Sequence, residues 1–180
     1  MLTVSDPLWW KYHFSQLGSF GDRSASIFNI TLIIAGALVV AFSTYLGRDL
    51  AALRDRGVLR PRRTPRLVAT LFVIMGVLLA GVGAVSVSMY EPLHIAFAVG
   101  MFAVFIGMLV AAPRIFAGMP RAVLVVTWMF LAAILLVVVL FWPIGYLNLT
   151  ALELVAFGLI FGWIVVFIRL ETAAAAAAEE

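Results

Sequence analysis

Five long apolar runs alternate along the chain with short segments that are rich in polar, glycine and proline residues. We expect one transmembrane helix in each run, at residues 26–46, 67–87, 93–112, 122–142 and 150–168. About 20 helical residues rise roughly 30 Å, which is the thickness of the hydrocarbon core of a bilayer. The pattern therefore predicts an all-α fold, an integral membrane bundle of five transmembrane helices.

The segments 1–25 and 171–180 lie outside these runs and differ from each other. The first is too polar to span a membrane, and it interleaves aromatic with polar side chains between residues 9 and 20. Because amphipathic aromatic residues prefer the headgroup region, we expect it to lie on the membrane or to fold over the bundle. Asp22 or Ser24 can cap the first helix. The second segment is alanine-rich, and it either continues the last helix or forms a low-complexity end.

The composition supports a membrane protein and removes several classes of function. Hydrophobic residues make up 65% of the chain and charged residues 12%, against about 25% charged residues in a soluble domain. The absence of cysteine excludes disulfides, thiolate catalysis and cysteine metal sites, and two histidines are too few for a histidine-rich metal site. We therefore expect no metal and no cofactor. No polar domain is available to present a basic face to nucleic acid, so we expect no nucleic-acid partner.

The distribution of basic residues predicts the orientation of the bundle. Ten of the twelve lie in the first loop, around the third loop or after the fifth helix: Arg48, Arg54, Arg56, Arg60, Arg62, Arg63, Arg66, Arg114, Arg121 and Arg169. By the positive-inside rule, the N-terminus lies outside and the C-terminal tail is cytoplasmic, as in a multi-pass protein of the cell membrane. The arginines of the first loop could form a patch for nucleic acid or an anionic ligand. We favour the interpretation that these arginines set the topology and contact anionic lipid head groups on the cytoplasmic side.

The remaining polar residues gather on the outer side of this topology, at or just below the surface. The cluster contains Asp22, Arg23, Ser24, Asn29, Glu91, His94, Asn148 and Glu153. An ionised side chain inside a helix is costly in lipid, so such residues usually face the bundle and have a partner. For Glu153 we expect Arg23 as that partner. For His94 we expect Asp22 or Glu91.

Three interpretations of this cluster are open. In the first, it is a structural cap that ties the helix ends to the N-terminal segment. In the second, which we adopt as the working hypothesis, all its members except Asp22 form an outer pocket that binds a membrane lipid or a partner protein's helix. In the third, the protein is an outer-leaflet lipid hydrolase or transferase that uses His94 with Asp22 or Glu153, because imidazole transfers protons near neutral pH. A metal site from these three residues would need a ligand spacing that the sequence does not fix.

Several short motifs resemble one known family. They lie at residues 9–10, 14–18, 28–29, 92–94 and 145–153. As a set they resemble the prokaryotic membrane-protein family called domain of unknown function 998, which is distantly similar to the Frag/DRAM/Sfk group of eukaryotic membrane proteins. The resemblance implies a helical bundle with a Ser-x-Leu-Gly segment outside the membrane and a histidine that opens a later helix. It assigns no activity, although some eukaryotic members of the distant group act in lipid handling.

Overall fold

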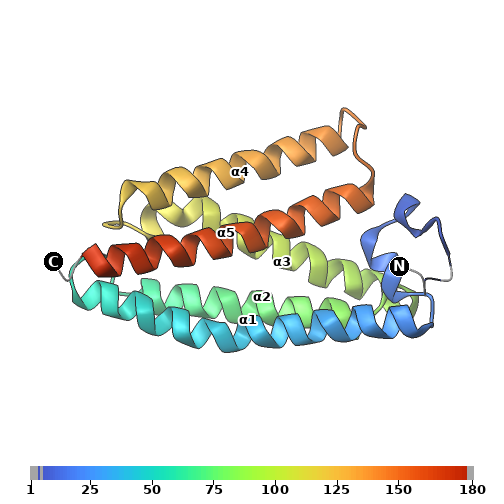
Figure 1. Cartoon of the computed structure of the whole chain (residues 1–180), viewed down its shortest axis with the longest axis horizontal. Helices are drawn as coiled ribbons and strands as arrows, with labels where there is room; N and C mark the ends of the chain where they lie inside the picture. Colours follow the sequence, from blue (N-terminus) through green and yellow to red (C-terminus); the bar gives the residue numbers. More distant parts are fainter. Residues whose placement is uncertain (1–3, 5, 178–180) are drawn as a thin grey trace.

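The computed structural model describes residues 4 and 6–177, and this part of the chain contains helices and no strand. Two short 3-10 helices precede five long helices that run back and forth along one axis (Figure 1). Their bounds are η1 Trp9–Lys11, η2 Phe14–Gly18, α1 Arg23–Asp55, α2 Thr64–Ala84, α3 Val87–Ile115, α4 Arg121–Phe141 and α5 Leu149–Ala177. Each of the five is long and apolar enough to cross a membrane. The prediction of an all-α bundle with five helices of membrane-spanning length and hydrophobicity is confirmed.

The two ends of the bundle carry different segments, and we name them by these. The lid end carries residues 9–18, which we call the lid, together with the α2–α3 and α4–α5 turns (Figure 1). The arginine end carries the α1–α2 and α3–α4 loops and the end of α5 (Figure 1).

Three of the helices, α1, α3 and α5, extend beyond their predicted bounds by more than one helical turn. The first continues past Gly47, where a side chain would come within 3.1 Å of the Ala69 Cβ. This glycine therefore marks a close approach of α1 to α2 and not a helix end. The third begins before Pro92, and Tyr90 breaks its regular path with φ −158° and ψ 89°. The last runs into the alanine-rich segment as far as Ala177, in accord with the high helix propensity of alanine.

Small residues bring α1 and α2 into the closest contact of the bundle. A Cβ atom added at Gly76 would lie 2.6 Å from the Gly36 carbonyl oxygen, and one at Gly83 would lie 2.5 Å from the Asn29 carbonyl oxygen. Such approaches are typical of small-residue stripes in membrane helices. Two glycines of the other helices differ from these, because an added Cβ at Gly107 of α3 or Gly158 of α5 meets no atom within 4 Å.

Large aromatic side chains fill the half of the bundle nearer the arginine end. The Trp163 ring packs against Phe105 and stacks on Phe167, with ring centroids 5.6 and 4.9 Å apart. Its indole Nε1 donates a hydrogen bond of 3.2 Å to the Thr127 hydroxyl, which in turn donates to the Val123 carbonyl at 2.7 Å. The Thr127 hydroxyl therefore joins the backbone of its own helix to the Trp163 ring of α5.

Candidate functional site

The lid is held on the bundle by three hydrogen bonds between its backbone and the side chains of Asn29, Asn148 and Glu153. The Asn29 amide donates to the Gly18 carbonyl at 3.0 Å, and the Asn148 amide donates to the Trp10 carbonyl at 2.9 Å. The Phe14 backbone N–H donates to the Glu153 carboxylate at 2.5 Å. Short 3-10 helices leave backbone N–H and C=O groups without hydrogen-bond partners, and these three side chains act as the partners. Polar residues of α1 and α5, together with the turn before α5, therefore position the lid.

Aromatic contacts add to this attachment, and Phe14 is their centre. Its ring meets Phe28 of α1 edge-on at 5.1 Å and lies 6.2 Å from Phe157 of α5. The ring of Phe157 in turn lies 5.9 Å from Phe102 of α3. Aromatic pairs in such geometries contribute about 0.5–1.5 kcal/mol each beyond the burial of their surface. The lid is thus an integral part of the bundle's packing.

His94 lies buried near the start of α3, below the lid. Its Nδ1 lies 2.7 Å from the Val85 carbonyl oxygen. A carbonyl oxygen only accepts, so Nδ1 carries the proton and donates, which leaves Nε2 of the neutral ring without a proton. The hydrogen bond therefore fixes both the orientation of the ring and the nitrogen that can act as a base.

A small cavity joins His94 to Glu153 under the lid. Its volume is about 30 Å³, and Phe14 and Ser15 of the lid also line it. A space of this size holds about one water molecule. His94 and Glu153 are thus brought to a single cavity, whereas a molecule larger than water would require the lid to move.

A second histidine, His13, lies in the lid itself. Its Nδ1 is 3.2 Å from the Ser15 hydroxyl oxygen. Burial and the neighbouring His94 lower the pKa of His13 below its ordinary value, and Glu91 partly opposes them. His13 therefore lies close enough to His94 and Glu91 for their charges to affect its protonation.

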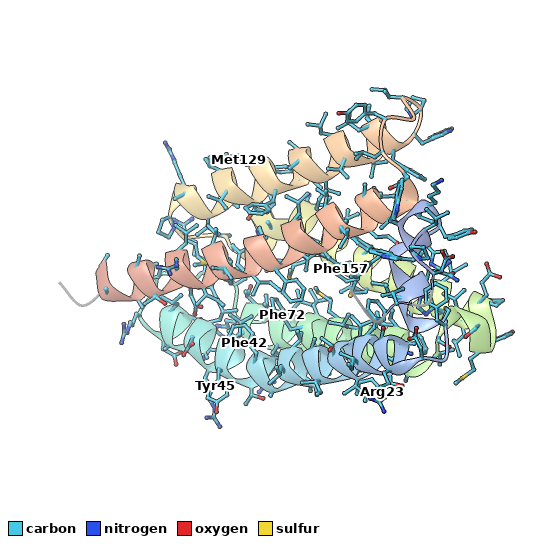
Figure 2. The ribbon with its side chains drawn as sticks, turned by 45° about the vertical axis from the view of Figure 1, so that its right-hand side comes forward. Arg23, Phe42, Tyr45, Phe72, Met129 and Phe157 are labelled. Atoms are coloured by element: carbon cyan, nitrogen blue, oxygen red, sulfur yellow. The ribbon has the colours of Figure 1, made fainter. Side chains whose placement is uncertain are left out.

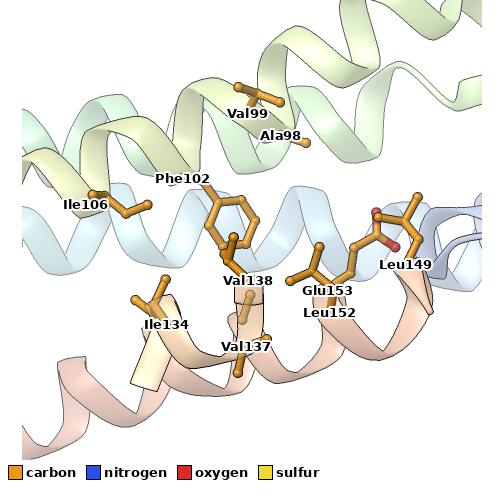
Figure 3. Close-up of a pocket in the computed structure, with 11 residues that line it drawn as sticks. Ala98, Val99, Phe102, Ile106, Ile134, Val137, Val138, Leu149, Leu152 and Glu153 are labelled. Carbon is orange, nitrogen blue, oxygen red and sulfur yellow. The ribbon is translucent and has the colours of Figure 1, made fainter. Parts of the chain in front are cut away.

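A larger cavity opens beside the small one, between α3, α4 and α5. Its volume is about 310 Å³, and it shares Ala98, Phe102 and Glu153 with the small cavity. Figure 3 shows Phe102 reaching from α3 toward Val138 of α4, with Glu153 at the side of α5. The remaining walls are aliphatic, and Glu153 is the one ionisable residue among the residues that line it. This carboxylate thus lies between the lid and an apolar cavity.

Neither of the predicted ionic partnerships occurs. Glu153 accepts from the Phe14 N–H, and Arg23 is exposed on α1, where Figure 2 shows it pointing away from the bundle. His94 bonds to the α2 end, and Asp22 caps α1 by accepting from the Ala25 N–H at 2.8 Å. The Asp22 cap was predicted and is confirmed. In each case the side chain bonds to a backbone group at a helix end, and not to the charged side chain that was expected.

The predicted cluster is thus divided into two groups. Asn29, Asn148, Glu153 and His94 lie at or below the lid. Asp22, Arg23 and Ser24 remain at the start of α1, and Glu91 is exposed near the His13 side of the lid. Within the described residues, no group of three or more histidine, aspartate or glutamate side chains could hold a metal ion.

Sequence reasoning missed His13, Ser15 and the Phe14 amide as parts of this site. The Phe14–Glu153 bond joins positions 139 residues apart, and a backbone N–H leaves no trace in a sequence pattern. The family motif at residues 14–18 was the one available signal, and it covers both Phe14 and Ser15.

The comparisons with known proteins agree with the motifs. A family model described as "Protein of unknown function (DUF998)" matches residues 2–170. No curated protein and no solved structure matches the chain. Because the model covers nearly the whole bundle together with the lid, the chain belongs to the DUF998 family of proteins of unknown function.

Proposed function

We propose that this protein binds a membrane lipid, with an acyl chain in the cavity between α3, α4 and α5. The observation that supports the proposal is an apolar cavity of about 310 Å³ with one carboxylate, Glu153, at its border with the lid. Ligand pockets have volumes of roughly 300–1,000 Å³ and combine apolar walls with a few placed polar groups. This cavity lies at the lower limit of that range, which suits one segment of an acyl chain.

The chemistry of the walls favours a lipid over a polar solute. A polar solute among aliphatic side chains would lose its hydrogen bonds to water without replacement, at a cost of several kcal/mol. The border of the cavity includes Val99, Val138 and Leu149, which are partly exposed on the outside of the bundle. A chain could therefore enter from the side, and its polar head would lie near the lid and Glu153.

We further propose that the lid end faces outward across the cell membrane. The arginine end holds most of the basic residues, whereas Lys11 and Arg23 lie at the lid end, a distribution that follows the positive-inside rule. The natural chain has no cysteine, so single substitutions report accessibility cleanly. We expect a membrane-impermeant maleimide to label Tyr146→Cys on intact cells and to label Arg63→Cys only after lysis. The reverse labelling pattern would show that the arginine end faces outward.

Native mass spectrometry of the full chain, extracted in a mild detergent, tests lipid binding. We expect wild-type protein to carry a copurified lipid that Ala98→Phe loses, because the larger side chain fills the cavity. Gly107→Leu is the matched control, since it enlarges a residue of the same helix where an added Cβ meets nothing within 4 Å. Val138→Trp repeats the test from the partly exposed side of the cavity. A wild-type protein without lipid, or equal loss in the control, would refute the proposal.

Catalysis is the second candidate, and one observation favours it: His94 and Glu153 line the same small cavity. A water there could attack the acyl-ester carbonyl of a phospholipid while His94 Nε2 takes its proton and passes it to the departing alcohol, which releases a fatty acid. Asp22 is no longer a candidate for this chemistry, because its carboxylate caps α1. We expect His94→Asn to abolish release of fatty acid from phospholipid vesicles while lipid still copurifies. If wild-type protein releases no fatty acid from the vesicles, the hydrolase hypothesis is refuted.

A further inference from the structure

At the arginine end, hydrogen bonds fix the backbone of the loop between α1 and α2. The N–H groups of Val58 and Leu59 both donate to the Leu53 carbonyl, at 3.0 and 3.2 Å. The side chain of Leu59 is buried, and the Arg60 N–H donates to the Ala117 carbonyl at 2.9 Å in the α3–α4 loop. The two loops are therefore joined into one surface, and the bond to Ala117 fixes the backbone of Arg60 in it.

Part of this surface is hollow. A cavity of about 470 Å³ is lined by Arg54, Asp55, Arg60 and Arg62, together with Gly57 and Leu59. The Arg54 guanidinium is neutralised by Asp55, with Nε and Nη2 at 3.0 and 2.7 Å from the same carboxylate oxygen. Within the described residues, neither Arg60 nor Arg62 has an ion-pair partner. The cavity therefore presents two uncompensated guanidinium groups.

The position of the cavity along the bundle suits a charged group at the membrane surface. Helix α1 has 33 residues and is about 50 Å long, whereas the hydrocarbon core is about 30 Å thick. Its last turns, which carry Arg54 and Asp55, therefore extend beyond the apolar core to the level of the lipid head groups. Guanidinium groups bind phosphate oxygens through paired hydrogen bonds, which a single ammonium group cannot reproduce.

We propose that this cavity is a phosphate-binding site in which Arg60 and Arg62 hold the anion. Two sources carry this chemistry: the phosphodiester of an anionic lipid such as phosphatidylglycerol, and free phosphate. The site is independent of the lipid cavity at the lid end. It also differs from a topology signal, because such a signal requires positive charge in the loop but neither a cavity nor a particular cationic group.

The test measures binding of phosphatidylglycerol to the full chain in neutral detergent, with phosphatidylcholine as the comparison lipid and inorganic phosphate as competitor. We expect R60Q/R62Q to weaken phosphatidylglycerol binding by tenfold or more. R60K/R62K keeps the charge and the topology, and we expect it to weaken binding at least threefold. The matched control is R114Q/R121Q, which removes the same charge at the same end from positions outside the cavity and should bind like wild type.

The outcomes distinguish free phosphate from a lipid phosphodiester as the ligand, and they can refute the proposed site. Displacement of the lipid by millimolar phosphate would assign the site to phosphate itself, whereas tight lipid binding without displacement would assign it to a lipid head group. Equal losses of binding in R60Q/R62Q and R114Q/R121Q, or wild-type binding by R60K/R62K, would refute the proposal. Either result would show that binding depends only on the net positive charge of this end. Unchanged melting temperature of each variant shows that a loss of binding is not a loss of fold.

Discussion

The two ends of the bundle are built from similarly apolar helices but are stabilised in different ways. Toward the arginine end, α3 and α4 meet, and Phe105, Phe116, Trp163 and Phe167 are completely or almost completely buried (Figure 1). Toward the lid end, α3 and α4 separate, and a cavity of about 310 Å³ lies between them and α5 (Figure 3). There the lid is attached by hydrogen bonds to its backbone.

Side-chain volume explains this difference better than hydrophobicity does. Within α5 alone, Trp163 and Phe167 fill the packed half, whereas Leu152 and Ala156 border the cavity. Lipid tails are as apolar as the side chains of the helices, so moving a side chain from lipid into the bundle gains little hydrophobic free energy. Helices in a membrane therefore associate mainly through close packing. One half of the bundle therefore supplies stability, and the other half leaves space for a ligand.

The largest expected effect comes from removing the central ring of the packed half. Trp163→Ala should destabilise the bundle by roughly 3–5 kcal/mol, because it leaves a cavity among buried rings. It also removes the hydrogen bond to Thr127. Unfolding by increasing SDS in mixed micelles measures the change.

Trp128→Ala is the matched control for this substitution. This tryptophan is 46% exposed on the outside of α4, so its loss should cost about 0.5 kcal/mol or less. Similar costs for the two variants would contradict the division of the bundle into a packed and an open half.

A smaller effect is expected at the lid. Glu153→Gln replaces a charge-assisted hydrogen bond to the Phe14 N–H with a neutral one, which should weaken lid docking by about 1 kcal/mol. Hydrogen exchange of the lid should accelerate about fivefold, while exchange at the arginine end stays unchanged. Glu91→Gln, an exposed carboxylate at the same end, provides the comparison. Equal acceleration in both variants would show that Glu153 does not anchor the lid.

The smallest effect is a pH dependence of the lid through His13. Burial beside His94 lowers the pKa of the docked His13 below 6.5, and Glu91 partly opposes this. The undocked segment therefore binds the proton more tightly, so docking is strongest above pH 6.5 and weakens as the pH falls below it. Spin labels at Tyr12→Cys and Tyr146→Cys should report a wider distance distribution at pH 5 than at pH 7.5.

His13→Gln removes the titrating group while keeping a polar side chain beside Ser15. We expect the distance distribution of this variant to be the same at both pH values. If the acid-induced widening persists in it, another group controls the lid.

Local sequence signals were sufficient for several features of the fold. Runs of apolar residues long enough to cross a bilayer determined the five helices, since lipid requires each backbone to satisfy its own hydrogen bonds. The cap by Asp22 and the backbone bond of Thr127 follow from side chains that reach groups three or four residues away.

The candidate site depended on contacts that only the tertiary structure fixes. Glu153 was expected to pair with the opposite charge of Arg23, yet its partner is a backbone N–H that the fold brings to it from position 14. Gly76 and Gly107 both lie inside apolar helices, yet an added Cβ at Gly76 would meet α1, whereas one at Gly107 meets no atom within 4 Å. Hydropathy and capping act within a few residues, so the sequence determines them. Partners and cavities depend on how distant helices lie against each other, and only the assembled bundle decides that.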